Sequence, residues 1–570
     1  MRLRRRMRFA RRAIKPELMP DPLVFDSEQR LDLRASILGR NNPREPASTL
    51  TTAALCAVAT ALLFTIGGAE PEMWMCALFA PMPILAIAPE LRTETAAELA
   101  FAAFLIGNLI AWGGESFAVP LATMLASHLA GAVVFAVFVV CAAEATRRWP
   151  GWLAALVFPT FEVAFYYTLS LESPHGTWGS PAYSQVDFLP LLQTASWVGM
   201  CGVMFIMSLL PSGLAVAWYR HRWNMGNWTR AAMLAIGVFA AAVLIGEIRV
   251  ILTPKTPAVR VAMIASAGLI PESESSEPTD AADILAVYAK MVHQAASAGA
   301  QIVVMPEKII GVAPSYEWDV VLGLQRVAQM SHVWLVVGLN QIGRSPKRNI
   351  AVVFDPDGKI VASYAKHHPI PSLEWDYKAG SKPAIFDAPW GRTAVLISQD
   401  LDFPDTARQL AADDVRVVVA PASDWQGSEV IHQRMSVVRG VESGFSLARA
   451  ASGGVLSAND SRGRLIASRE PARGGDTMVL GNLPIGTGRT LYSRTDDWFG
   501  RLCVIFTILL MLRLAVGVLS SAQMRRRGAA KRIKRPEGVV SVEMNRQEQA
   551  VEKPEEPEQE IYRPPARPRE

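Results

Sequence analysis

Three polar side chains that could take part in chemistry stand at the ends of apolar runs. Glu307 follows "VVMP", Lys366 follows "IVASYA", and Ser398 ends "TAVLIS". Runs of this length are typical of buried strands in parallel sheets, and such sheets place their sites at the carboxyl ends of strands. A carboxylate, an ammonium and a hydroxyl at three strand exits could therefore converge in one cleft. Charged residues are also ordinary where strands reach the surface, so spacing alone leaves both interpretations open.

These side chains belong to a region, residues 256–498, in which strands and helices alternate. The segment 280–300 is an amphipathic helix with apolar residues at helical spacing. The predicted strands are "VRVAMIAS", "QIVVMP", "VWLVVGL", "IAVVFDPDG", "IVASYA", "TAVLIS", "VRVVVAP" and "GVLSANDSRG". This alternation predicts one α/β domain with a largely buried sheet.

The rest of the chain is unusually apolar. The 570 residues are 51% hydrophobic and only 19% charged. Between residues 51 and 252 the apolar content falls into blocks long enough to cross a hydrocarbon core of about 30 Å as helices. The predicted spans are 51–68, 74–90, 97–113, 119–143, 151–171, 193–218 and 231–252, with an eighth at 502–521. Pro81 and Pro83 interrupt the second of these spans.

Charge at the ends of the spans predicts their orientation. The opening "MRLRRRMRFARRAIK" carries eight basic residues and no acidic one, and no apolar core follows closely enough for a signal peptide. With residues 1–50 in the cytoplasm, the inner loops carry the arginines and the outer loops carry no Lys or Arg. The α/β domain is then extracytoplasmic. Basic tails that flank spans are orientation signals that touch anionic lipid, so no nucleic acid is expected as a partner. The tail 522–570 is expected to be disordered.

Cysteine usage limits the chemistry of the outer domain. The five cysteines (Cys56, Cys76, Cys141, Cys201 and Cys503) all lie in or beside predicted spans. The outer domain therefore has no disulfide, no thiolate metal site and no thiol nucleophile. Without a metal-spaced His/Cys cluster or a glycine-rich phosphate loop, no cofactor is expected.

Several stretches resemble those of the apolipoprotein N-acyltransferases, bacterial membrane proteins with a nitrilase-like (carbon–nitrogen hydrolase) domain. "MPEKIIG" resembles the catalytic Glu segment, and "YAKHHPIPSLEW" resembles the catalytic Lys segment with an accessory glutamate. "SDWQGSEVIHQRMSVVRGVESGFSLARAASGG", with Arg439 and Glu442, matches the segment after the nucleophile. "GRTLYSRTDDWFG" and "GTWGSPAYSQVDFLPLLQTASWVG" match the closing motif and the loop before the sixth span. The resemblance covers about residues 50–521, including the order of seven spans, domain and one span.

The resemblance implies a fold, a reaction and site residues. The fold is an eight-helix membrane bundle with an αββα nitrilase-like domain, in the inner membrane. The catalytic positions are Glu307 as general base, Lys366 as oxyanion stabiliser and Ser398 as nucleophile, with Glu374 as the accessory glutamate. The reaction moves an acyl group from a phospholipid donor to the amino terminus of a diacylated lipoprotein acceptor.

The chain departs from the family at the nucleophile, where Ser398-Gln399-Asp400 stands in place of a cysteine motif. A serine hydroxyl is a much weaker acid than a thiol and normally needs a positioned His or Lys as base. Lys366 could serve only with a depressed pKa, which a neighbouring Glu307 opposes. His367 and His368 point to opposite sides of an extended segment, so at most one would face the cleft.

Three functional hypotheses remain open from the sequence. The first is a serine-based or otherwise altered acyltransferase or amidohydrolase. The second is a catalytically inactive homologue that binds lipid or lipoprotein. The third is an active cysteine enzyme in which Ser398 arose recently or was introduced. In the membrane half, Glu162 could line a lipid path or pair inside the bundle, and Trp178 and Tyr183 could touch acyl chains or be ordinary interface aromatics.

Overall fold

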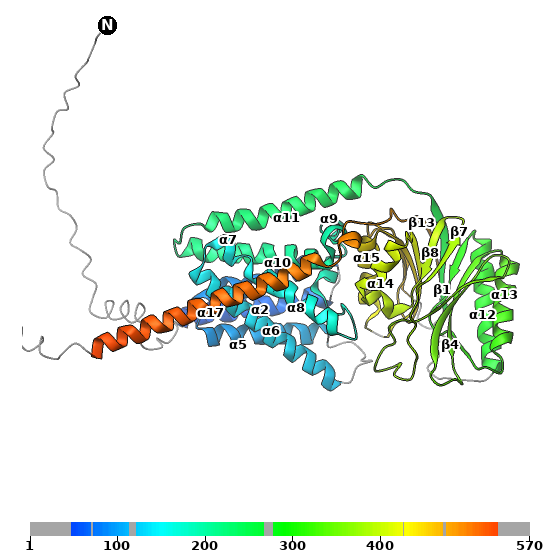
Figure 1. Cartoon of the computed structure of the whole chain (residues 1–570), viewed down its shortest axis with the longest axis horizontal. Coiled ribbons are helices and arrows are strands. Elements are labelled where there is room, and N and C mark those ends of the chain that lie inside the picture. The colour runs from blue at the N-terminus through cyan, green and yellow to red at the C-terminus, as the bar shows by residue number, and fades with distance from the viewer. Residues whose placement is uncertain are drawn as a thin grey trace, which may run out of the picture. The chain divides into compact units, whose positions relative to one another are not determined.

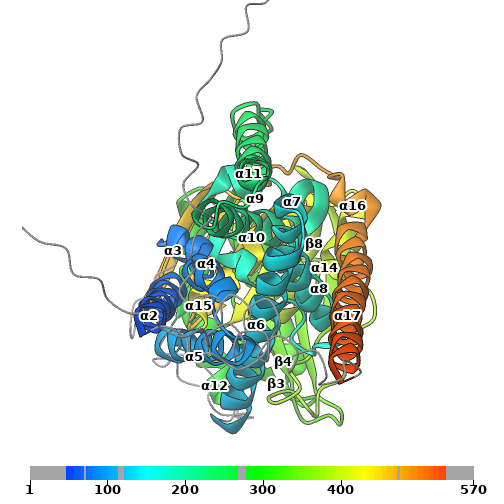
Figure 2. The ribbon, with the colours of Figure 1, turned by 90° about the vertical axis from the view of Figure 1, so that its left-hand side faces the viewer.

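The computed structural model describes residues 47–69, 72–112, 121–266, 278–425, 427–470 and 475–533. Within these residues, seven helices are long and apolar enough to cross a membrane. They are α2 (Ala47–Ala69), α5 (Thr93–Trp112), α6 (Leu121–Arg148), α8 (Val157–Glu172) together with the short α7 (Gly151–Ala154) that precedes it, α10 (Ala195–Arg222), α11 (Trp228–Ile251) and α17 (Trp498–Ile533). Helices α2, α5, α6, α8 and α10 pack side by side in this order, as seen from the end of the bundle in Figure 2.

The second predicted span is not a continuous helix, so the structure gives seven long helices where eight were predicted. Residues 74–90 form two short helices, α3 (Trp74–Phe79) and α4 (Met82–Ile87), and the 3₁₀ turn η1 (Ala88–Glu90). Prolines lack the backbone N–H and clash with the preceding turn, and Pro81 and Pro83 stand where the helix breaks. Ile84 and Ile87 are buried, so α4 packs inside the bundle.

Two other long helices differ from the predicted spans. Helix α17 continues to Ile533, so residues 522–533 are helical and the disorder predicted for them is wrong. The remaining predicted tail, and residues 1–46, lie outside the described residues. Helix α10 is kinked at Gly199, which has φ of +69°, and a Cβ there would lie 2.5 Å from the Tyr492 ring. Glycine is required because it alone combines the positive φ with this close approach.

The α/β domain consists of two sheets packed face to face with helices on both outer sides, as predicted (Figure 1). The seven-stranded sheet has the order β13-β1-β2-β4-β5-β6, with β3 paired to β4, and the six-stranded sheet has the order β12-β11-β10-β9-β8-β7. The strands of the first sheet are β1 (Ala258–Ser266), β2 (Ile302–Val304), β3 (Ile310–Val312), β4 (Trp334–Gln341), β5 (Arg348–Phe354), β6 (Ile360–Ala365) and β13 (Asp476–Pro484). Those of the second are β7 (Ala384–Ala388), β8 (Gly391–Val395), β9 (Val417–Ser423), β10 (Ser446–Ser452), β11 (Leu456–Asn459) and β12 (Leu465–Arg469).

Alternation along the strands builds two cores. On β1, Val261 and Met263 face the core between the sheets, whereas Ala262 and Ile264 face the helices α12 (Pro278–Ser297) and α13 (Glu317–Ser331). The second sheet is covered by α14 (Pro404–Ala412) and α15 (Glu429–Ser443). The central strands of both sheets are buried on both faces, which explains the continuous apolar runs in the sequence.

The membrane bundle and the α/β domain are joined through α15, which packs against α10. Arg439 and Glu442 on α15 are fully buried and form an ion pair of 2.6 Å. The Arg439 guanidinium donates to the Tyr183 hydroxyl at 3.0 Å, and the Met200 amide donates to Glu442 Oε1 at 2.7 Å. The Arg-x-x-Glu segment noted in the sequence therefore docks the domain onto the membrane helices.

Candidate functional site

Lys366 lies between two carboxylates at the edge of the first sheet. It follows β6 and is 1% exposed. Its Nζ is 2.8 Å from Glu307 Oε1 and 2.9 Å from Glu374 Oε2. Asn349 on β5 donates to both carboxylates, and Lys308 Nζ donates to Glu374 Oε1 at 2.9 Å. Three of the four residues singled out in the sequence are therefore in direct contact.

The charges of this cluster hold one another in place. Burial opposes the charged form of Lys366, but the Glu307 and Glu374 carboxylates outweigh it and raise the pKa of the lysine above its ordinary value. Against the effect of burial, the Lys366 and Lys308 ammonium groups lower the pKa of Glu374 to about 2. Lys366 is thus a permanent ammonium at neutral pH. It can stabilise an oxyanion, but it cannot take a proton from Ser398.

Ser398 begins the 3₁₀ turn η4 (Ser398–Asp402), which follows β8 in the second sheet. The serine is 5% exposed and has φ of +43°. A non-glycine residue in this left-handed region is strained, and such strain is common where a nucleophile sits on a tight strand-to-helix turn. The Ser398 hydroxyl has no hydrogen-bond partner among the described residues.

Asp400 ties the Ser398 turn to the Lys366 segment. Its carboxylate is fully buried and accepts from the amides of His367 at 3.1 Å and His368 at 2.8 Å. It also accepts from the Tyr364 hydroxyl at 2.8 Å. Both histidine amides are therefore directed at Asp400, and the His368 ring stacks on Phe403 with centroids 3.6 Å apart.

The same turn touches the membrane half of the protein. The Asp402 carbonyl accepts from the amide and the hydroxyl of Thr177, at 3.0 and 2.7 Å. Gln399 donates to the Pro174 carbonyl at 2.9 Å. A Cβ on Gly176 would lie 2.5 Å from the Asp402 carbonyl oxygen, so this loop approaches the turn closely because it has glycine there. The Ser398 turn is thus a contact point between the bundle and the domain.

Ser398 opens onto a cavity of about 530 Å³ between the two halves. This volume falls within the range of about 300–1,000 Å³ that is usual for ligand sites. Membrane helices supply Phe104, Met124, Phe165 and Leu169, and the domain supplies Ile370, Trp425 and His432; Trp178 comes from the loop after α8. Lys366, Glu307 and Glu374 are not among the residues that line it.

His432 is a cavity residue that the sequence did not single out. It lies on α15, is 5% exposed, and its ring centroid is 4.8 Å from Trp178 and 5.1 Å from Trp425. Its Nδ1 is 3.0 Å from Oδ1 of Asp424, which also binds Arg449. Although burial raises the pKa of Asp424, Arg449 and His432 lower it to about 2, so this carboxylate is ionised. Asp424 directly follows β9, a position at which the sequence could have indicated a site.

Asp402 is a second buried acid on the cavity wall. It is 3% exposed, and burial raises its pKa to about 7, partly offset by His432 and by Arg439. An unfolded aspartate titrates near 3.9. The folded state therefore binds this proton more tightly, and the contribution of Asp402 to stability falls as pH rises from about 4 through about 7.

An Asp402→Asn variant stays neutral and should escape this loss. We expect its melting temperature to match that of the wild type near pH 4 and to exceed it at pH 8. Between these pH values, the difference in unfolding free energy between the variant and the wild type should widen by up to about 1.4 kcal/mol per pH unit. Thermal unfolding in detergent across this pH range measures the gap, and Asp405→Asn, at an exposed carboxylate three residues on, is the control. A gap that does not change with pH would contradict the expectation.

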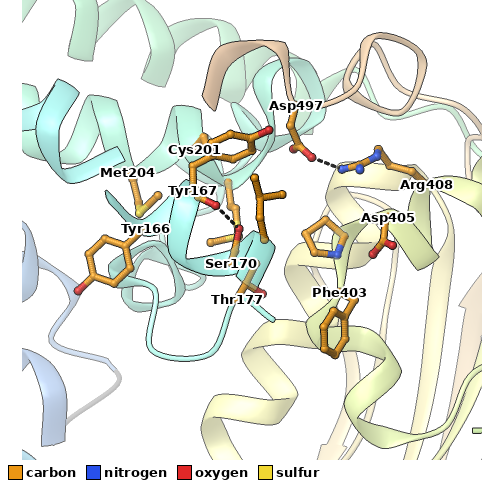
Figure 3. A pocket seen from close by; sticks show the side chains of 13 residues that line it. Tyr166, Tyr167, Ser170, Thr177, Cys201, Met204, Phe403, Asp405, Arg408 and Asp497 are labelled. Carbon is orange, nitrogen blue, oxygen red and sulfur yellow. Dashed lines mark hydrogen bonds and ion pairs between the residues drawn. The ribbon is translucent and has the colours of Figure 1, made fainter. Parts of the chain in front are cut away.

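A smaller cavity of about 190 Å³ lies nearby and is separate from the chemistry of Ser398. Figure 3 shows it between α8, α10 and the segment Phe403–Arg408. Arg408 there forms an ion pair of 2.6 Å with Asp497, and Ser170 donates to the Tyr167 carbonyl. Arg408 on α14 is already paired with Asp497, which precedes α17. We therefore interpret this cavity as part of the contact between α14 and the closing motif, and not as a second reactive site.

The remaining candidates from the membrane half have distinct contacts. Glu162 on α8 accepts a hydrogen bond from Ser208 on α10 and does not line the large cavity. Tyr183 is buried and bonded to Thr177 and Arg439, whereas Trp178 lines the cavity. Among the described residues, no group of three or more His, Cys, Asp or Glu could hold a metal ion.

Known protein families match both the membrane half and the α/β half of the chain. Residues 60–213 match the family model of the apolipoprotein N-acyltransferase N-terminal domain, and residues 263–474 match that of carbon–nitrogen hydrolases. The apolipoprotein N-acyltransferase of Geobacter metallireducens is 24% identical over 379 residues, covering 61% of this chain and 71% of that protein. That of Bradyrhizobium diazoefficiens is 24% identical over 382 residues, covering 60% and 69%. The crystal structure of an amidase from Nesterenkonia sp. is 19% identical, covers 44% of this chain and 97% of the amidase, and has a TM-score of 0.37.

Proposed function

The chain is an apolipoprotein N-acyltransferase-like, multi-pass bacterial membrane protein with a nitrilase-like domain, and from this premise we propose that it transfers an acyl group through Ser398. The observation that carries the proposal is the position of Ser398. Its buried hydroxyl, on a strained turn, opens onto a cavity of about 530 Å³ whose far wall is made of membrane helices. An acyl chain could reach the hydroxyl from the membrane without crossing water.

The roles proposed for the polar residues follow from their charges. Ser398 attacks the carbonyl carbon of the acyl donor. Lys366, a permanent ammonium held by Glu307 and Glu374, does not line the cavity, so it stabilises the developing oxyanion through its charge and not by direct contact. Glu374 and Asn349 keep Lys366 and Glu307 in place, because Glu374 pairs with Lys366 and Asn349 donates to both Glu307 and Glu374.

The proposed donor is a phospholipid and the proposed acceptor is the amino terminus of a diacylated lipoprotein, since the relatives are named apolipoprotein N-acyltransferases. We place the protein in the inner membrane with the nitrilase-like domain on the extracytoplasmic side. Arg147 and Arg148 end α6, and Arg220 and Arg222 end α10, at the end of the bundle away from the domain (Figure 1). Arginine-rich ends face the cytoplasm.

The test is the intact mass of the detergent-purified full chain after incubation with phospholipid, beside a Ser398→Ala variant. An acyl adduct on the native chain, absent from the alanine variant, is the expected result. Peptide mapping must place the adduct on Ser398 and not on one of the five cysteines. An adduct of equal yield in the alanine variant would overturn the proposal.

A second candidate function is binding of lipid or lipoprotein without turnover. It is favoured by one observation, that the nitrilase-like domain has no cysteine at all. It predicts that phospholipid co-purifies in the cavity while no adduct and no product form. Turnover of any acyl donor by the purified protein would exclude it. The altered amidohydrolase considered from the sequence would instead release free acid from a short-chain amide.

A further inference from the structure

The residues that flank Ser398 in the cavity differ from those that surround Lys366. Ser398, Asp402 and His432 line the cavity, whereas Glu307, Lys366 and Glu374 do not. Helix α15, which carries His432, packs against the η4 turn that begins with Ser398. His128 and His175 line the same cavity, but among the described residues only His432 of these three has a carboxylate, Asp424, beside its ring.

His432 has the surroundings of a catalytic imidazole. Asp424 Oδ1 lies 3.0 Å from Nδ1, a contact that is short but poorly aligned for a hydrogen bond, so its effect is chiefly electrostatic. The carboxylate favours a proton on Nδ1, which leaves Nε2 as the basic nitrogen. Nε2 has no partner among the described residues. The rings of Trp178 and Trp425 pack next to the imidazole.

Asp424 is well suited to hold this histidine. It is fully buried and receives two hydrogen bonds from Arg449, which is itself 1% exposed. This ion pair keeps the carboxylate charged and fixes its position at the end of β9. The arrangement of serine, histidine and buried aspartate is the one that serine enzymes use on unrelated folds.

We propose that His432, oriented by Asp424, is the general base and acid for Ser398, in place of the carboxylate that serves a thiol nucleophile. This inference rests on the proposed acyl transfer and adds a catalytic residue to it. It resolves the difficulty raised by the sequence, because Lys366 cannot accept a proton and a serine hydroxyl needs a base.

The proton balance is closed by His432 alone. As Ser398 Oγ bonds to the carbonyl carbon of the ester donor, its proton passes to Nε2. The bond from that carbon to the leaving alkoxide breaks, and Nε2 returns the proton to the alkoxide, which leaves as an alcohol. In the second half, an amine attacks the acyl-serine ester and gives up a proton to Nε2. That proton then returns to Ser398 Oγ as the amide product forms.

The test compares His432→Gln in two backgrounds, the native Ser398 chain and Ser398→Cys. The full chain in detergent micelles containing phosphatidylethanolamine is followed by intact mass, and the initial rate of adduct formation is measured. With serine, loss of the base should lower the rate by about 10²-fold or more. With cysteine, whose thiol ionises far more easily, the loss should be under about 10-fold. His293→Gln, at an exposed histidine on α12, is the matched control.

The pH profile supplies a readout that damage to the cavity would not reproduce. The native rate should rise with pH, because a general base acts only in its unprotonated form, and His432→Gln should abolish this rise. The charged and titratable groups near His432 are Asp424 at the end of β9, with its partner Arg449, Asp402 on η4, and His128 and His175, which line the same cavity. Asp402→Asn is therefore measured in parallel, and it should leave the rise in place.

The outcomes separate this inference from the function on which it rests. No adduct on the native chain at any pH would overturn both. An adduct on the native chain whose rate and pH profile are unchanged in His432→Gln would overturn the role of His432 alone. Equal losses in the serine and cysteine backgrounds would assign His432 a structural role, and a second variant, His432→Asn, guards against a folding defect peculiar to glutamine.

Discussion

Replacing Ser398 by cysteine is expected to raise the initial rate of acyl-adduct formation by about 10²-fold or more, the scale that activation of a nucleophile by a base usually supplies. A thiol titrates near 8.5, so a useful fraction is already thiolate at neutral pH, whereas a serine hydroxyl must lose its proton during the attack. The substitution is nearly isosteric. The turn with φ of +43° and the Asp400 anchor should therefore be unchanged.

The measurement is the time course of intact mass in phospholipid micelles at pH 7.5, with the adduct located by peptide mapping. Ser372→Cys is the control, because Ser372 lines the same cavity but lies on a different loop. A thiol there lacks the strained turn and should gain no comparable rate. If Ser398→Cys were no faster than the native chain, the site would no longer be shaped for acyl transfer, and the binding function would gain support.

The sequence predicted the elements whose residues carry strong periodicity or apolar character. The buried runs of β4, β5, β8 and β9 and the amphipathic helix α12 were all expected, and each appears. Strand β10 was missed because "SLARAAS" consists largely of small or charged residues and has weak strand character. The strand is fully buried between β9 and β11, and its Arg449 can be buried because it pairs with Asp424 on the neighbouring segment. That contact is tertiary, so no local pattern could reveal it.

The candidate site also contains residues that the sequence could identify and one that it could not. Glu307, Lys366 and Glu374 could be named because each lies at a strand exit or in a motif, and the structure places them in one ion-pair cluster. Ser398 could be named from the end of its apolar run. His432 lies in the first turn of α15, and a histidine on a helix is more often an ordinary packed residue. Only the packing of α15 against η4 and the bundle brings it to the wall of the cavity.

Replacing Lys366 by methionine is expected to abolish adduct formation and to destabilise the nitrilase-like domain by about 3–5 kcal/mol, the usual cost of leaving a buried charge without its partner. Lys366 is 1% exposed, and its removal leaves the carboxylates of Glu307 and Glu374 buried with less positive charge nearby. Lys308 and Asn349 still contact Glu374, so part of the cluster persists. The thermal unfolding of the full chain in detergent, with proteolysis of the domain as a second probe, measures the loss.

The pH dependence of this loss distinguishes a missing charge from a missing side-chain volume. In the native chain the pKa of Glu374 is held at about 2, so its contribution to stability is present above the unfolded value of about 4.3 and is lost as pH falls toward 2. Without Lys366 the carboxylates protonate more readily. The difference in unfolding free energy between the native chain and Lys366→Met should therefore be largest at neutral pH and become smaller as pH falls below about 5. Lys359→Met, at an exposed lysine in the turn before β6, should change stability by no more than about 0.5 kcal/mol. A pH-independent gap for Lys366→Met would instead assign the loss to packing alone.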